Sequence, residues 1–246
     1  MPSILSRLFS FVGKGESKPY CSVVVPAAGQ SSRMQGENKL FTIINDIPVL
    51  ALTLEALERC ELFDEIVIAA QPEKIIEISN LCVQYKIDKV SKVITGGKTR
   101  AESVLAGVLE VSDKAEYIAV HDAARPFVTQ KLLAEVTQAA FLHNAAVPAV
   151  PVKDTLKVVR DGYVVSTPER SQYAAIQTPQ VFRHEMLKGA LTKALEDRIE
   201  VTDDASAVER LGVSIKVVSG DYKNIKITTP DDIALARVLM EERDVW

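Results

Sequence analysis

Cysteine is scarce in this sequence, and a net positive charge and a membrane-length apolar run are both absent. The three cysteines, Cys21, Cys60 and Cys82, are widely spaced in 246 residues and form no C-x-x-C pair. This argues against a disulfide framework or a zinc site and favours free thiols in a reducing cytoplasm. The formal net charge of −4 gives no overall reason to expect nucleic acid as a partner, so phosphate chemistry would need a local cluster of cations. No apolar run is long enough to span a bilayer.

Two common phosphate-binding motifs and a nucleophilic triad are also missing. Gly29 stands alone in its loop, and neither G-x-x-x-x-G-K-[ST] nor G-x-G-x-x-G occurs there, which argues against a P-loop ATPase or a dinucleotide dehydrogenase. No serine or cysteine nucleophile in a recognisable setting accompanies His121. A structural imidazole that tethers its loop is therefore favoured over direct catalysis at that position.

What the sequence does contain is the composition of a large α/β domain. It is 47% hydrophobic and 25% charged, which suits one substantial core. Residues 1–20 stand apart, because a short apolar stretch interrupted by Arg7 is followed by a linker with two glycines. We expect a flexible amphipathic appendage at 1–20, too short in its apolar part to cross a membrane, and one domain at 21–246.

Alternating β-branched runs and amphipathic stretches predict a parallel sheet covered by helices. Strands are expected at 22–25, 65–70, 89–95, 116–122, 214–218 and 224–228, and helices at 47–59, 72–86, 183–196 and 202–212. In such sheets ligands collect beyond the carboxyl ends of the strands. The expected fold is therefore Rossmann-like, a mostly parallel twisted sheet with helices on both faces and a site at one edge.

The loop after the first strand has the properties of a phosphate-holding loop. Ala27, Ala28 and Gly29 are small enough for backbone N–H groups to approach a ligand, and Arg33 and Lys39 add positive charge. A polyphosphate suits this combination. The alternative is a tight strand-to-helix turn that binds nothing.

Two further strand ends carry candidate residues. Gly96 and Gly97 precede a helix, and freed backbone groups there can contact the edge of a nucleobase, although a plain glycine turn with Thr99 as N-cap fits equally well. Asp122 ends a strand beside the expected phosphate site, where Mg²⁺ would be wanted. Aspartate is as often a simple turn former at such a place.

Four stretches together carry a resemblance to a known family. They are 26–34 (P-A-A-G and R-M), 96–104 (G-G and R-A-E-S-V), 120–126 (V-H-D-A-A-R-P) and 224–231 (N-I-K-I-T-T-P-D). In this order they resemble the 2-C-methyl-D-erythritol 4-phosphate cytidylyltransferases of the non-mevalonate isoprenoid pathway, from about residue 21 to about the C-terminus. The chain departs from the family where Ser31 replaces a usual glycine, where Lys98 replaces a common aspartate, and where Lys39 lies one residue closer to the arginine.

The resemblance implies a role for each matching residue. The CTP triphosphate would lie against Ala27, Ala28, Gly29, Ser31, Arg33 and Lys39, and the cytosine and ribose against Gly96, Gly97 and Ser103. The second substrate would meet Asp122, Arg125 and Thr202, and Asp122 would also meet Mg²⁺ or another divalent cation. Arg33, Lys39 and Lys226 would be the catalytic residues, screening the repulsion between the anionic reactants.

Residues 145–180 break the alternation of helices and strands. Asp161 and Gly162 lie between two β-rich runs and predict a hairpin. Similar proteins use this excursion as an extended β-arm that is exchanged across a homodimer, so Thr155 and Arg170 would bind the methylerythritol phosphate in the neighbouring subunit. The alternative is a hairpin folded against its own domain.

The implied activity is a cytoplasmic nucleotidyl transfer from CTP, a co-substrate, to 2-C-methyl-D-erythritol 4-phosphate, with no nucleic acid and no membrane span involved. A phosphate monoester is already ionised near neutrality, so its attack needs no general base. Two alternatives stay open at this point. One is a cytidylyltransferase for another polyol phosphate, such as ribitol 5-phosphate, and the other is a non-catalytic nucleotide-binding regulator.

Overall fold

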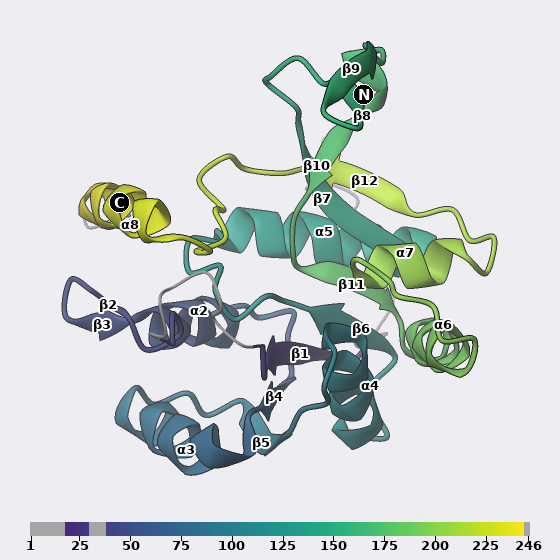
Figure 1. Ribbon diagram of the computed structural model, residues 1–246. Coiled ribbons are helices and arrows are strands. Elements are labelled where there is room, and N and C mark those ends of the chain that lie inside the picture. The colour runs from purple at the N-terminus through teal and green to yellow at the C-terminus, as the bar shows by residue number, and fades with distance from the viewer. Residues whose placement is uncertain (1–17, 30–37, 244–246) are drawn as a thin grey trace, which may run out of the picture.

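A mixed sheet of eight strands forms the centre of the molecule (Figure 1). The structure is a computed structural model, and the residues it describes are 18–29 and 38–243. Most of the expected appendage at 1–20 therefore lies outside the described residues, as do Ser31 and Arg33. Within the described ranges no helix is long and apolar enough to cross a membrane.

The sheet is largely parallel, as expected. Its strands are β1 (Cys21–Ala27), β4 (Glu65–Ala70), β5 (Val90–Thr95), β6 (Tyr117–Val120), β7 (Ala145–Pro151), β10 (Ala174–Ile176), β11 (Gln180–Arg183) and β12 (Lys216–Ser219). They are ordered β10-β7-β11-β6-β1-β4-β5, with β12 beside β7. The strands β6, β1, β4 and β5 are parallel, and so are β12 and β7. In contrast, β11 is antiparallel to β6 and β7, and β10 is antiparallel to β7.

The order of the parallel strands creates a switch point at β1. This strand lies between β4 and β6, so the chain leaves β1 toward one side of the sheet and later returns on its other side. Open α/β sheets bind ligands at such a reversal, beyond the carboxyl ends of the strands. The residues that follow β1 and β6 are therefore the first place to look for a site.

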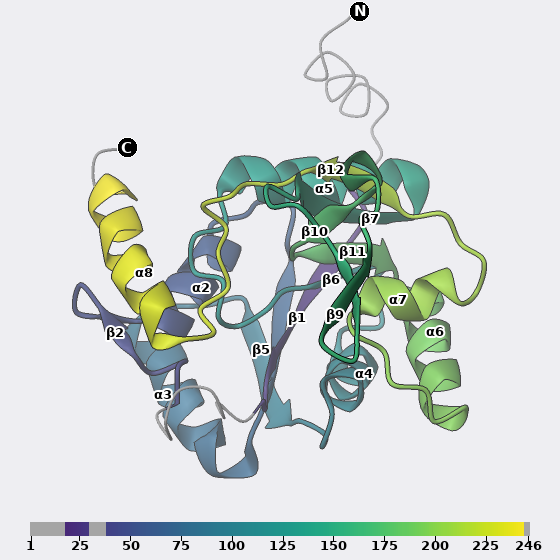
Figure 2. The same ribbon diagram turned by 45° about the horizontal axis from the view of Figure 1, so that its top comes forward.

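Helices cover both faces of the sheet (Figure 2). They are α2 (Val49–Glu58), α3 (Ile75–Gln84), α4 (Arg100–Glu110), α5 (Gln130–His143), α6 (His184–Glu196), α7 (Asp204–Glu209) and α8 (Pro230–Arg243). Because side chains alternate along a strand, Val23 and Val25 enter the core that α2, α3, α5 and α8 cover, whereas Val24 enters the core under α4, α6 and α7. Both faces of β1 are thus buried, as in a central parallel strand.

Three expected elements differ in the structure. Residues 224–228 are not a strand; side chains and single backbone hydrogen bonds hold this segment, as described below. The expected helix at 47–59 begins only at Val49, because the small hairpin of β2 (Ile43–Ile44) and β3 (Ile47–Pro48) precedes it. The first strand, expected at 22–25, extends to Ala27, since Pro26 is paired with Ala69 and Ala27 with Ala70.

The excursion between β7 and β10 projects from the sheet. Its tip is a hairpin of β8 (Val158–Arg160) and β9 (Tyr163–Ser166), and Asp161 and Gly162 adopt φ angles of 49° and 82° in the turn, as the sequence predicted. The projecting part is shorter than the expected 145–180, because β7, β10 and β11 belong to the central sheet. We call residues 152–173 the arm.

Candidate active site

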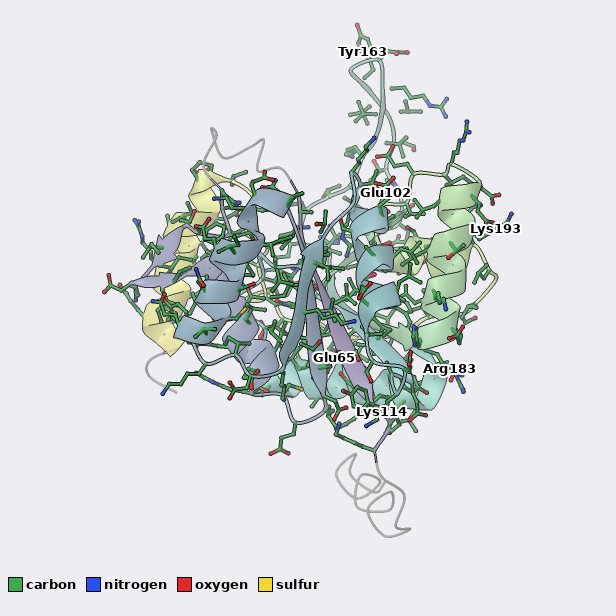
Figure 3. The ribbon with its side chains drawn as sticks, turned by 90° about the horizontal axis from the view of Figure 1, so that it is seen from below. Glu65, Glu102, Lys114, Tyr163, Arg183 and Lys193 are labelled. Carbon is green, nitrogen blue, oxygen red and sulfur yellow. The ribbon has the colours of Figure 1, made fainter. Side chains whose placement is uncertain are left out.

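The carboxyl ends of the parallel strands surround a cavity of about 400 Å³. The residues lining it are Pro26, Ala27, Ala28, Gly29, Lys39, Leu40, Gln71, Pro72, Glu73, Gly97, Lys98, Thr99, Arg100, Ser103, Asp122, Ala123, Ala124 and Lys226. In Figure 3, Glu65 marks the amino end of the sheet, whereas Glu102, at the start of α4, lies at the opposite end, from which the arm with Tyr163 projects. The cavity is therefore at the switch point of the fold.

Asp122 is the electrostatic centre of this cavity. Its Oδ2 atom lies 2.9 Å from Lys226 Nζ and 3.4 Å from Arg125 Nε, and its Oδ1 atom lies 3.6 Å from Arg100 Nε. Burial opposes ionisation of Asp122, but the charges of Lys226, Arg100 and Arg125 outweigh that effect and hold its pKa well below the usual range. The carboxylate is thus charged at all physiological pH values.

Arg100 is shared between two carboxylates. Its Nη2 atom donates to Asp204 Oδ2 at 2.7 Å, and its Nε atom faces Asp122. Burial would lower the pKa of Arg100, but the negative charge of Asp204 outweighs this and raises it. Asp204 is fully buried, and burial raises the pKa of its carboxyl while Arg100 opposes that rise. Arg100 therefore stays charged at the cavity wall.

Close packing shapes the wall of the cavity formed by the glycine pair at 96 and 97. A Cβ atom at Gly96 would lie only 2.5 Å from Ala28 Cβ, so glycine at 96 allows the loops after β1 and β5 to meet. The Ser103 hydroxyl accepts from Gly97 N at 3.1 Å and donates to Thr99 O at 2.9 Å. Thr99 and Glu102 complete a capping box at the start of α4. The glycine pair is thereby held as one rigid turn.

Two other side chains fix the loops around the cavity, Gln71 from the cavity lining and Thr53 from the core. Gln71 donates from Nε2 to Ala28 O at 3.3 Å, and Thr53 donates from its hydroxyl to Ala123 O at 2.9 Å. The first contact supports the Ala-Ala-Gly loop, and the second supports the loop after β6. Both loops are thus anchored to neighbouring elements of the domain.

His121 tethers its loop, as the sequence analysis favoured. It is fully buried, with Nε2 3.2 Å from Arg125 O and Nδ1 3.2 Å from Thr178 Oγ1. Burial lowers the pKa of His121 to about 4. The imidazole is thus neutral near pH 7 and is occupied by structural contacts.

The segment that carries Lys226 is held by hydrogen bonds at several points. Arg125 Nη1 donates to Asn224 O at 2.7 Å, and Ile227 N donates to Ala124 O at 2.9 Å. Gln177 adds a bond from Nε2 to Asp221 O at 2.7 Å. Ile227 is fully buried while the Lys226 side chain is 40% exposed. These contacts, in place of a strand ladder, point Lys226 toward Asp122.

The structure brings most of the expected site residues together. Those that line the cavity are Ala27, Ala28, Gly29, Lys39, Gly97, Ser103, Asp122 and Lys226. Gly96 supports the same wall from behind. Arg125 does not line the cavity, because its guanidinium is engaged by Asp122 and Asn224.

Three expected residues lie elsewhere in this chain. Thr202 is exposed in the turn before α7. Arg170 lines a second cavity of about 560 Å³ at the base of the arm, where its Nη1 atom donates to Lys153 O at 2.7 Å. Thr155, also on the arm, is exposed and lines neither cavity.

Neither Arg100 nor Asp204 was predicted to have a role in the site. Arg100 lies in the 96–104 stretch that carries the family resemblance, but that stretch gave it no role of its own. Asp204 lies in an acidic pair at the start of α7, where a helix cap explains acids sufficiently. Their contact spans 104 residues of sequence, and no local pattern reports such a pairing.

Comparison with known proteins gives one consistent match. A family model described as 2-C-methyl-D-erythritol 4-phosphate cytidylyltransferase matches residues 21–242. The curated protein of that name from Bacillus thuringiensis (strain Al Hakam) is 44% identical over 216 residues, which cover 87% of this chain and 95% of the relative. The one from Caldanaerobacter subterraneus subsp. tengcongensis is 42% identical over 224 residues, covering 90% of this chain and 99% of the relative.

Solved structures agree with these relatives. The crystal structure of 4-diphosphocytidyl-2C-methyl-D-erythritol synthase from Anaerococcus prevotii is similar with a TM-score of 0.82 and 30% identity, covering 91% of this chain and 97% of that one. The cytidylyltransferase from Thermus thermophilus is similar with a TM-score of 0.74 and 32% identity, covering 89% and 98% of the two chains.

Proposed function

Because this chain belongs to the 2-C-methyl-D-erythritol 4-phosphate cytidylyltransferase family, we propose that the cavity around Asp122 is where its reaction takes place. The chain transfers CMP from CTP to 2-C-methyl-D-erythritol 4-phosphate. The products are 4-diphosphocytidyl-2-C-methyl-D-erythritol and pyrophosphate, and the reaction is a step in the synthesis of isoprenoid precursors. The contacts of Asp122 with Lys226, Arg100 and Arg125 carry the assignment of the cavity.

On the nucleotide side, small residues leave backbone groups open to CTP. The cytosine and ribose lie against Gly96, Gly97 and Ser103, whose turn is fixed by hydrogen bonds. The triphosphate lies against Ala27, Ala28, Gly29 and Lys39, which line the same cavity. Ser31 and Arg33, which come between Gly29 and Lys39 in the sequence, are proposed as further contacts of the triphosphate. Backbone N–H groups and cations together suit a polyphosphate.

The transfer itself needs charge stabilisation more than proton transfer. An oxygen of the substrate phosphate attacks the α-phosphorus of CTP, and the bond from that phosphorus to the bridging oxygen breaks, so that pyrophosphate leaves with the electron pair. The attacking group is already an anion near pH 7. Lys226 and Lys39 align the attacking phosphate with the α-phosphorus, opposite the leaving pyrophosphate, and stabilise the negative charge of the transition state.

A divalent cation fits the residues present. Mg²⁺ is usually bound through one or two carboxylates together with substrate phosphates. Asp122 supplies one carboxylate at the cavity, and its lowered pKa keeps that ligand ionised. Asp122 would therefore hold the ion against the phosphates, where the ion would neutralise part of their charge.

The arm fits a role in a homodimer. Thr155 and Arg170 do not line the cavity of their own chain, while Val158, Val159, Tyr163, Val164 and Val165 are exposed large apolar residues on it. Contact with a second copy would cover such residues. The arm then delivers Thr155 and Arg170 to the methylerythritol phosphate at the partner's cavity, and Thr202 approaches the same substrate.

The compartment follows from thiol chemistry. Cys21, Cys60 and Cys82 are buried and free in the structure, and free thiols are typical of a reducing environment. The cytoplasm is accordingly the proposed location.

One assay tests the function and its alternatives together. Pyrophosphate release from CTP is measured with 2-C-methyl-D-erythritol 4-phosphate, with ribitol 5-phosphate and without acceptor. The proposal expects release that depends on the methylerythritol phosphate and on a divalent cation. Faster release with ribitol 5-phosphate, or CTP binding without release, would overturn it.

A further inference from the structure

A fully buried carboxylate outside the cavity contacts Arg100. Asp204 is 0% exposed, and its Oδ2 atom accepts from Arg100 Nη2 at 2.7 Å. We propose that Asp204 is a positioning residue, which holds Arg100 at the cavity wall and so prevents this guanidinium from pairing fully with Asp122. The proposal rests on the function assigned above.

The two oxygens of Asp122 are used unequally. Lys226 and Arg125 both contact Oδ2. Among the described residues the ion-pair neighbour of Oδ1 is Arg100 Nε at 3.6 Å, beyond hydrogen-bond range. Oδ1 therefore keeps its capacity to accept from a substrate.

Without its bond to Asp204, the Arg100 guanidinium would move closer to Asp122 Oδ1. A guanidinium and a carboxylate favour a two-bond pair, and Asp122 already lies beside Arg100. Asp204 competes for the same guanidinium through its shorter contact. As a result, Arg100 stays charged at the cavity wall, and Asp122 Oδ1 accepts no hydrogen bond from it.

Asp204 is itself rigidly placed. The side chain of Gln180, in β11, accepts from Ala205 N at 2.9 Å and donates to Asp203 Oδ2 at 2.8 Å, so both neighbours of Asp204 are fixed to the sheet. Asp203 also caps α7 by accepting from Ser206 N. Because its neighbours are fixed, Asp204 cannot move toward the cavity together with Arg100.

Fold stability alone does not explain this buried charge. Asp204 Oδ1 is buried without a hydrogen-bond partner among the described residues, so the cost of burying the charge is only partly offset by Arg100. A neutral side chain of the same shape would avoid that cost. The burial of this charge is instead explained if the Asp204–Arg100 pair arranges the charged groups of the cavity.

The charge count predicts how a neutral residue at 204 would act. Arg100, Arg125 and Lys226 carry positive charge, and Asp122 and Asp204 carry negative charge, which leaves one net positive charge. In an Asp204→Asn variant this cluster gains one positive charge. CTP should bind as tightly or more tightly, whereas turnover should fall because the released Arg100 pairs with Asp122.

The first test separates turnover from nucleotide binding. In Asp204→Asn we expect kcat to fall at least about 10-fold, with the dissociation constant for CTP, measured by calorimetry without the second substrate, unchanged or lower. Thermal unfolding establishes that the variant is folded. A folded variant with parental kcat, or one whose kcat and CTP affinity fall together, would overturn the positioning role.

Glu65→Gln is the matched control. Glu65 is also a buried carboxylate, but it lies at the amino end of β4 and accepts from Ser22 Oγ, Ser91 Oγ and Ser112 N. Its loss should lower the melting temperature and leave kcat unchanged. If Glu65→Gln lowers kcat as much as Asp204→Asn does at equal loss of stability, the effect at Asp204 is structural.

The second test asks whether Asp204 acts through Arg100. If it does, a variant with both Asp204→Asn and Arg100→Gln should have a kcat within about threefold of Arg100→Gln alone. If the two substitutions instead lower kcat by the product of their separate effects, the proposal is overturned. Because Arg100→Gln leaves Asp204 unpaired and is prone to unfold, the same cycle is measured with Arg100→Lys.

A parent protein that makes no product would refute the proposed function, whereas an active parent with an equally active Asp204→Asn refutes only the inference.

Discussion

At the scale of single residues, Asp122 takes part in most of the interactions proposed for the cavity. It follows an apolar strand directly, and this placement made it a candidate from sequence. Its carboxylate is 10% exposed, yet three surrounding cations keep it ionised. Local sequence could supply the aspartate and its place at a strand end. It could not supply two of the three cations, because Arg100 lies at the start of α4 and Lys226 lies about a hundred residues later in the chain.

Lys226 should matter far more for turnover than for stability. Its side chain is 40% exposed and contacts Asp122, so Lys226→Ala removes little packing but deletes a charge that acts on the transition state. We expect kcat to fall at least about 100-fold, measured by pyrophosphate release, with a small change in melting temperature.

The matched control is Lys223→Ala on the same segment. Lys223 pairs with Glu242 on the surface, away from the cavity, and its loss should leave kcat at the parental value. Equal losses in the two variants would mean that the segment, and not the Lys226 charge, is responsible.

His121 should make the protein less stable as the pH falls toward 4. Its folded pKa of about 4 lies below the unfolded value of about 6.5, so the unfolded state binds the extra proton between these two values. The free energy of unfolding should therefore decrease by about 2–3 kcal/mol from about pH 7 to about pH 4.5 through this group. Asp122 contributes only below that window, because its folded pKa is depressed and its unfolded pKa is about 3.8.

Urea unfolding at the two pH values measures this difference. His121→Gln cannot titrate, so its pH dependence should be reduced, whereas His143→Gln, at the exposed end of α5, should keep the parental dependence. A parental pH dependence in folded His121→Gln would show that another group is responsible.

At the scale of elements, Gly96 is where two loops meet. A Cβ atom there would lie 2.5 Å from Ala28 Cβ and 3.0 Å from Ser103 Oγ, and both neighbours line the proposed CTP site. Gly96→Ala should therefore raise the KM for CTP by about 10-fold or more, the equivalent of the 1–3 kcal/mol typical of overpacking. Steady-state kinetics with varied CTP measure it.

Gly189→Ala provides the opposite case. Gly189 lies inside α6, and apart from its two chain neighbours and the backbone of its own helix no described atom is within 4 Å of the position that a Cβ atom would take there. Alanine there should stabilise the fold by about 0.5–1 kcal/mol and leave the KM for CTP unchanged. An unchanged KM in Gly96→Ala would show that the loop contact is not needed for nucleotide binding.

Elements with a local cause were predictable from the sequence. The hairpin turn at Asp161 and Gly162, the cap at Thr99 and the strand at 65–70 depend on residues within a few positions. The segment 224–228 was wrongly predicted as a strand, although its alternation of isoleucine and lysine fits one. Its backbone bonds instead to Ala124 and Arg125, which only the tertiary fold brings near.

At the scale of the whole molecule, the proposed exchange of the arm would connect activity with assembly. If Thr155 and Arg170 act at the partner's cavity, homodimers of Arg170→Ala and of Lys226→Ala should both turn over poorly. Mixed dimers should partly recover, because one of their two sites has its arm from the Lys226→Ala chain and its lysine from the Arg170→Ala chain.

Differently tagged chains, purified together, supply verified mixed dimers for that comparison. Their pyrophosphate release is measured against the two parent variants at equal protein concentration. Mixed dimers that are no more active than the parents would mean that the arm serves its own subunit.

A crystal structure of this protein with CTP bound would test most directly whether the cavity around Asp122 is the active site. We predict cytosine beside Gly96, Gly97 and Ser103, with the triphosphate extending toward Lys39 and Lys226 in that cavity. CTP bound instead in the second cavity, beside Arg170 at the base of the arm, would contradict it.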